Sequence, residues 1–118
     1  MQYDVNWIKC NREKWYNLLN LDLSDPHFEG LVGVYIIWHG GNNPATVRIG
    51  QGVIRDRLAK HKQDPEILRY QEYGLFVTWA QVPEQYLDGV ERYLGEVLNQ
   101  IVGSRLPDVS PIRINLPW

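Results

Sequence analysis

Cysteine is nearly absent from this chain of 118 residues, since Cys10 is the only one. A single cysteine excludes an internal disulfide and any zinc site built on several thiolates. The three histidines show no His-Glu-x-x-His spacing, which argues against a catalytic zinc helix. We therefore interpret Cys10 as a small, partly buried hydrophobic residue.

Long apolar runs are also missing, and none approaches the roughly 20 residues that cross a bilayer. The start MQYDVNWIKC lacks the basic and apolar regions of a secretory signal. We expect a soluble, cytoplasmic protein with no membrane partner. Because no internal repeat, low-complexity tract or linker occurs, the length favours a single domain.

An overall excess of positive charge is lacking as well. The net charge of −2 and the pI near 5.9 argue against a purely electrostatic binder of nucleic acid. Segment 48–62 is the exception, because it holds five basic residues against Asp56 alone, a local balance of 5 − 1 = +4. We expect this segment to contact a phosphate-bearing partner. Its basic residues are Arg48, Arg55, Arg57, Lys60 and Lys62.

Two β-branched runs, 34–38 and 46–49, flank a turn-rich segment and predict a β-hairpin. Strict alternation along the second run places Arg48 on the face opposite to its two neighbours. Arg48 can then share a face with Tyr35, provided that the register of the hairpin permits it.

The segment Gly50-Gln51-Gly52 follows, and we expect it to form a tight corner into a helix. No Gly-Lys-Ser/Thr follows these glycines, so they are not a phosphate-binding P-loop. In the helix, Ile54 and Leu58 face one way, while Arg57 and His61, four residues apart, share another side.

The first 30 residues are expected to form a helical extension packed on the core. Asn11 is a candidate cap for a helix with Trp15, Leu18 and Leu19 on one side. The stronger interpretation of its aromatic residues is core packing rather than a partner surface.

Residues 31–118 contain the remaining predicted elements. Asp64-Pro65 favours the start of a short helix, residues 75–82 a third strand, and residues 84–102 a helix with an apolar stripe. The proline-rich tail should be irregular yet pinned to the body. The predicted fold class is α/β, an α+β sandwich in which helices flank a small three-stranded, mostly antiparallel sheet.

Five features follow one another through residues 31–118: Gly33-Val34-Tyr35, Arg48-Ile49-Gly50, Arg57, Glu91 and Asn115. In this order they resemble the two signatures, the helix arginine, the metal-binding glutamate and the terminal asparagine of the GIY-YIG nuclease domain. Members of that family hydrolyse DNA phosphodiesters with a divalent metal. The resemblance therefore implies a metal-dependent DNA endonuclease, and it leaves RNA open as an alternative substrate.

The resemblance also implies roles for single residues. Glu91 would hold one Mg²⁺ or Mn²⁺ completed by waters and phosphate oxygens, and the metal would polarise the phosphoryl group. Arg57 would pair with the non-bridging oxygens as negative charge develops. Asn115 would position the site by hydrogen bonds.

Arg48 departs from the family, whose second signature normally begins with tyrosine. Arginine stays protonated at working pH and does not act as a base. A neutral His61 would then take a proton from Tyr35 or directly from water, and Arg48 would become a second phosphate clamp.

Other interpretations remain open. In the first, the chain is a non-catalytic nucleic-acid-binding or regulatory module that needs no metal. Taken alone, Glu91 would be an ordinary helix residue paired with Arg92 or another neighbour. In the second, exposed tryptophans bind another protein. Because one small domain has little surface for target specificity, a homo-oligomer or a partner protein is expected to supply targeting.

Overall fold

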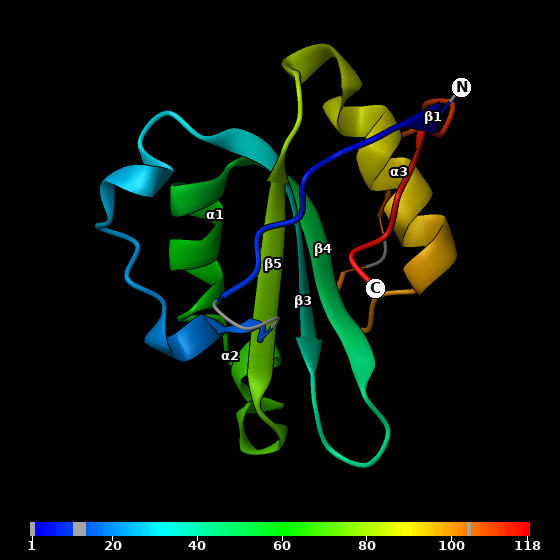
Figure 1. The fold of residues 1–118 in the computed structure, drawn as a ribbon. Helices are drawn as coiled ribbons and strands as arrows, with labels where there is room; N and C mark the ends of the chain where they lie inside the picture. The colour runs from blue at the N-terminus through cyan, green and yellow to red at the C-terminus, as the bar shows by residue number, and fades with distance from the viewer. Residues whose placement is uncertain (1, 11–13, 104) are drawn as a thin grey trace.

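Strand β3 (Val32–His39) pairs on both sides and organises the fold. The computed structural model describes residues 2–10, 14–103 and 105–118. Its main sheet is antiparallel and four-stranded, with the order β2-β5-β3-β4, and a separate pair joins β1 to β6 in parallel (Figure 1). The other strands are β1 (Gln2–Tyr3), β2 (Tyr16–Asn17), β4 (Ala45–Val53), β5 (Leu75–Gln81) and β6 (Arg113–Ile114).

The helices are α1 (Ile54–His61), α2 (Pro65–Leu68) and α3 (Leu87–Leu98). Four 3₁₀ turns accompany them in the described chain: η2 (Leu18–Asn20), η3 (Pro26–Phe28), η4 (Gln71–Tyr73) and η5 (Glu84–Tyr86). None of the helices in the described ranges is long and apolar enough to cross a membrane. The predicted α+β class is confirmed, but the sheet has a fourth, very short strand that the sequence did not indicate.

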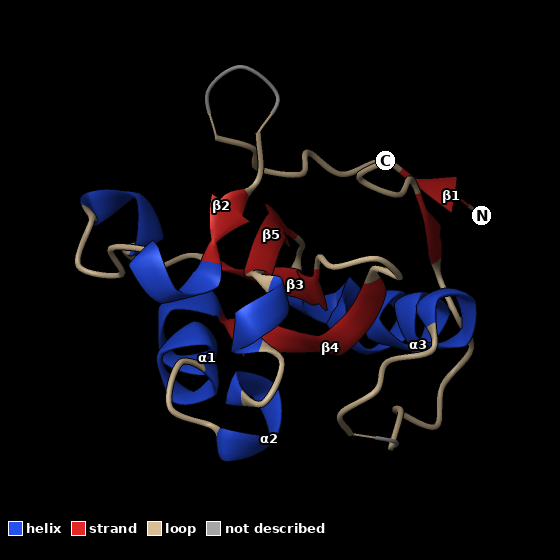
Figure 2. Cartoon of the chain, turned by 90° about the horizontal axis from the view of Figure 1, so that it is seen from below, coloured by secondary structure: helices blue, strands red, loops and turns tan. Residues whose placement is uncertain are grey.

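Two layers of helix sandwich the sheet, with α1 and α2 on one face and α3 on the other (Figures 1 and 2). Alternation along β3 divides the core accordingly. Tyr35 and Ile37 pack with Leu58 of α1, whereas Ile36 packs with Leu94 of α3. Each face of β3 is thus covered by a helical layer.

Strand β4 contains a bulge that strict alternation does not predict. Ile37 lies opposite Arg48, but Trp38 lies opposite Thr46, so Val47 is an extra residue in β4. Val47 therefore packs on the α1 face, whereas Ile49 packs on the α3 face. The prediction that the two neighbours of Arg48 share one face is wrong. Directly opposed residues share a face, so Arg48 lies on the α1 side and shares that face with Tyr35, as predicted.

The glycines of β4 do not form the predicted corner, because the strand continues through them to Val53. Gly50 lies opposite Tyr35, and a Cβ at Gly50 would overlap the Tyr35 phenol. Gly52 has φ +124°, and a Cβ there would lie 3.1 Å from Nε of Arg57. Both glycines therefore make room for side chains of the candidate site.

The predicted N-terminal α-helix is also not found among the described residues. Tyr16 and Asn17 pair with β5, and one 3₁₀ turn follows, where Oδ1 of Asn17 accepts from the Leu19 N–H at 3.0 Å. The predicted cap, Asn11, lies outside the described residues. Pairing with β5 satisfies the backbone here, so tertiary contact overrides the helical spacing. The segment nevertheless packs on the core, as Leu18 is fully buried.

Helix α3 ends earlier than its apolar stripe. Asn99 adopts a left-handed conformation with φ 52°, which ends the helix. The N–H groups of Ile101 and Val102 then donate to the carbonyls of Thr46 at 3.1 Å and Val47 at 2.8 Å. Segment 100–102 therefore covers the first half of the outer edge of β4, and the apolar residues beyond 98 belong to this cover.

The tail is pinned to the body, as predicted, and it is irregular apart from the two-residue strand β6. Asn115 bonds both backbone groups of Val5: its Oδ1 accepts from the N–H at 2.7 Å, and its Nδ2 donates to the carbonyl at 2.9 Å. The indole of Trp7 donates to the Asn115 carbonyl at 2.8 Å. One amide side chain thus joins the two ends of the described chain.

Asn115→Ala is expected to lower the free energy of unfolding by about 1–3 kcal/mol, because it leaves the two Val5 backbone groups unpaired. Urea denaturation followed by fluorescence measures this change. The exposed Asn6→Ala is the matched control, with an expected change within about 0.5 kcal/mol. Equal stabilities of the two variants would contradict the assigned role of Asn115.

Candidate active site

Tyr35 and His61 form a hydrogen-bonded pair between β3 and the last residue of α1. The Tyr35 hydroxyl lies 2.5 Å from Nε2 of His61. Burial raises the pKa of Tyr35 to about 12, whereas burial, reinforced by the positive charge of Arg48, lowers the pKa of His61 to about 4. At neutral pH both groups are therefore uncharged, and the Tyr35 hydroxyl donates a hydrogen bond to Nε2 of His61.

Two arginines surround this pair. The charges of Arg48 and Arg57 act on Tyr35, on His61 and on Glu91, so the five side chains share one electrostatic field. Arg57 is exposed and lines a depression of about 280 Å³ that Lys60 also lines.

Arg48 is held less completely than a structural arginine usually is. Its Nη1 donates to the Val102 carbonyl at 3.4 Å, and its buried Nε has no partner among the described residues. Buried donors are nearly always paired, because an unpaired one costs about 1–3 kcal/mol. Arg48 therefore brings to the site a positive charge and one buried donor that the described residues leave unpaired.

Glu91 reaches the site from α3, on the opposite layer. It is half-buried, and burial raises its pKa, an effect that Asp88 increases and that Gln51, Arg48 and Arg57 oppose. Gln51, on β4, donates from Nε2 to Oδ1 of Asp88 at 2.6 Å. Gln51 and Asp88 thus join β4 to α3 directly beside Glu91.

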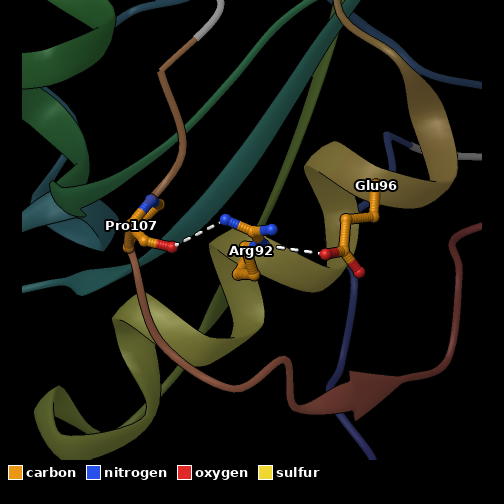
Figure 3. A network of polar contacts seen from close by, with 3 residues as sticks. All are labelled: Arg92, Glu96 and Pro107. Carbon is orange, nitrogen blue, oxygen red and sulfur yellow. Dashed lines mark hydrogen bonds and ion pairs between the residues drawn. The ribbon is translucent and has the colours of Figure 1, made fainter.

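The interpretation that Glu91 pairs with Arg92 is wrong. Nε of Arg92 lies 2.8 Å from Oε1 of Glu96, and its Nη1 donates to the Pro107 carbonyl at 3.3 Å (Figure 3). Glu91 takes part in no salt bridge within the described ranges. Its carboxylate is therefore available for another cation.

Two predicted nucleic-acid contacts have a structural role instead. Arg55 donates from Nε to the Leu23 carbonyl at 2.8 Å and from Nη2 to the Asp25 carbonyl at 3.1 Å. Lys62 donates from Nζ to the Leu21 carbonyl at 2.8 Å. Both side chains fasten loop 21–25 to α1, so the basic side chains left exposed on α1 are Arg57 and Lys60.

Asn115 is likewise not part of the cluster, because both ends of its amide bond the Val5 backbone. Tyr35, Arg48, Arg57, His61 and Glu91 are the predicted site residues that the structure brings together. Sequence reasoning missed Gln51 and Asp88. The spacing of Asp88 three residues before Glu91, which puts both on one side of a helix, is the signal that could have found Asp88.

The metal-binding capacity of the site is limited. No group of three or more His, Cys, Asp or Glu side chains that could hold a metal ion occurs in the part of the chain that is described. Glu91, with Asp88 one turn earlier, is the acidic position next to the basic cluster. In comparisons with known proteins, no family model, curated protein or solved structure matches this chain.

Proposed function

We propose that this protein is a divalent-metal-dependent endonuclease that hydrolyses DNA phosphodiester bonds in the cytoplasm, with residues 31–118 as a GIY-YIG-like domain. The hydrogen bond of 2.5 Å between Tyr35 and His61 is the observation that carries the proposal. A proton acceptor, two arginines and a carboxylate that forms no salt bridge are groups that can catalyse phosphodiester hydrolysis through general-base and electrostatic effects.

The proton path runs through the Tyr35–His61 pair. Since Nε2 of His61 already accepts from Tyr35, water gives its proton to the Tyr35 oxygen while Tyr35 passes its own proton to His61. Burial and the arginines hold the proton affinity of His61 low. A bound phosphate offsets the arginine charges, so the substrate itself raises the basicity of His61. Direct transfer from water to His61 is the alternative path.

The arginines bind the phosphate. Arg57 is exposed, and its planar guanidinium matches the non-bridging oxygens, which gain charge in the transition state. Arg48 adds a second positive charge that attracts the phosphate, since its charge already acts on Tyr35 and His61. Lys60, exposed one turn after Arg57, extends the positive surface toward the flanking DNA backbone.

Glu91 would hold the metal. Mg²⁺ or Mn²⁺ bound through one carboxylate keeps several waters and takes substrate phosphate oxygens, so the single half-buried Glu91 fits such an ion. When bound, the metal supplies Lewis-acid polarisation of the phosphoryl oxygen and stabilises the leaving oxygen. Because Glu91 would be the single protein ligand, the protein should bind the metal only weakly when no DNA is present.

A nicking assay tests the proposal. We expect the protein to nick supercoiled plasmid in Mg²⁺ or Mn²⁺ and to stop when EDTA removes the metal. Nicking that continues in excess EDTA would contradict metal dependence. Absence of nicking with either metal, at protein concentrations near that of the DNA, would contradict the nuclease itself. Cleavage of a labelled single-stranded RNA under the same conditions decides whether RNA is also a substrate.

The alternative function is a nucleic-acid-binding or regulatory module without catalysis. The observation that favours it is the replacement of a tyrosine by Arg48 within a cluster rich in positive charge. This alternative predicts salt-sensitive DNA binding in EDTA, weakened by Arg57→Ala and Lys60→Ala, with no cleavage in any metal. In either case we propose that a second copy or a partner protein supplies target specificity.

A further inference from the structure

A tryptophan-lined pocket lies outside the cluster described above. An open depression of about 300 Å³ lies at the end of the sheet where β3 ends and β4 begins, and it is lined by Trp38, Pro44, Ala45, Thr46 and Trp118. We propose that this pocket binds an unstacked nucleobase of single-stranded DNA. The inference rests on the proposed function and deepens it, because it specifies that the DNA bound next to the candidate active site is single-stranded.

The pocket walls are flat aromatic surfaces held in place. The rings of Trp38 and Trp118 lie 5.3 Å apart at 71°, so they form a corner. Trp15 packs edge-on against both, at 5.1 Å from Trp38 and 6.2 Å from Trp118, and Phe76 stacks on Trp38 at 5.9 Å. A preorganised aromatic corner suits a planar base, because every base has a π-face that stacks on an indole ring.

The pocket also offers unused polar groups at its edge. Neither the Thr46 hydroxyl nor the indole N–H groups of Trp38 and Trp118 take part in a hydrogen bond within the described ranges. Nucleobases carry both donors and acceptors on their edges, whereas an aliphatic side chain would leave these groups unpaired. Lys9 lies 4.7 Å above the Trp15 ring and adds positive charge near this corner.

The position of the pocket connects it to the proposed phosphate site. Thr46 and Arg48 are two residues apart on β4, a separation of about 7 Å along a strand. They face opposite sides of the sheet, and segment 100–102 covers the edge between them. A DNA strand whose phosphate lies near Arg48 can pass over segment 100–102 and place a neighbouring base in the corner that the tryptophans form, provided that the base is unpaired.

Trp118 is the residue to change, because it is 59% exposed and its removal leaves the buried core intact. The measurement is fluorescence anisotropy of a labelled single strand of about 12 nucleotides, and of a duplex of equal length, in EDTA at low salt. Trp118→Ala is expected to weaken single-strand binding about tenfold, with little change for the duplex. Trp118→Phe should retain most of the affinity. Val97→Ala, an exposed apolar position on α3, should bind as the wild type does.

Three results would overturn the inference: unchanged single-strand affinity of Trp118→Ala, an equal loss for single strand and duplex, or no affinity of the wild type for the single strand. The last result would leave a protein segment as the candidate occupant of the pocket. Because binding is measured in EDTA and nicking in Mg²⁺, the two proposals fail separately. A protein that shows the selective loss but never nicks plasmid would keep the pocket and lose the nuclease.

Discussion

Glu91→Gln is expected to reduce magnesium-dependent nicking by about 10³-fold, because a metal clamp on the phosphoryl group contributes several kcal/mol to the transition state. Glutamine keeps the size of the side chain and removes its charge. Burial raises the pKa of Glu91, so holding it charged at neutral pH works against folding. The variant should therefore be at least as stable as the wild type, and loss of activity will not reflect loss of fold.

Glu96→Gln is the matched control for Glu91→Gln. Glu96 lies on the same helix and forms a surface ion pair with Arg92, which is worth about 0–1 kcal/mol. This variant should nick as the wild type does. A second measurement does not depend on activity: Mg²⁺ at high concentration should raise the thermal midpoint of the wild type but not that of Glu91→Gln. Undiminished nicking by Glu91→Gln would remove Glu91 from the mechanism.

The elements that follow local patterns could be predicted from the sequence. β3, α1, α2 and β5 each carry a clear period or a turn signal, and each occurs close to where it was expected. The bulge at Val47 could not be predicted in this way, because it depends on how β4 is registered against β3. Likewise, the Gly50–Gly52 segment looks like a corner locally, and only the packing of the Tyr35 phenol explains why glycines occur within a strand.

The candidate site was also predicted only in part. The resemblance to a family in the sequence identified Tyr35, His61 and Glu91, which the structure brings into one electrostatic field from three different elements. The resemblance gave no information on which of these side chains form hydrogen bonds with backbone groups. Arg55 donates to loop carbonyls, and Asn115 bonds the Val5 backbone. Both side chains therefore have a structural role, although their types and their positions along the chain suggested a role in the site. Every residue type has the same backbone groups, so the sequence does not show which side chains bond to them. This explains why the roles of Arg55 and Asn115 were predicted incorrectly.

His61→Gln is the second change with a large expected effect. If His61 is the final proton acceptor, nicking should fall by about 10²–10⁴-fold, the usual contribution of a general base. His39→Gln is the control, because His39 stacks on Tyr70 outside the site and should keep full activity. Loss of activity in both variants would point to a general effect on folding, and full activity of His61→Gln would exclude His61 as the base.

Tyr35→Phe distinguishes the two proton paths. If the proton passes through Tyr35, the single variants Tyr35→Phe and His61→Gln and the double variant should lose similar amounts of activity, since the two residues act as a unit. If His61 takes the proton directly from water, Tyr35→Phe should keep much more activity than His61→Gln. Gly50 leaves room for the phenol, so removal of one hydroxyl will not disturb β4.

The pH dependence of stability tests the state of His61 without any substrate. Native His61 has its pKa lowered from 6.5 to about 4, so between these values the unfolded chain binds a proton that the native protein does not. Unfolding is then favoured as the pH falls, and the wild type loses stability across this window. His61→Gln lacks this contribution, so its stability should fall less between pH 6.5 and 4. Urea denaturation of both proteins at several pH values measures the difference, and parallel curves would show that His61 titrates normally in the folded protein.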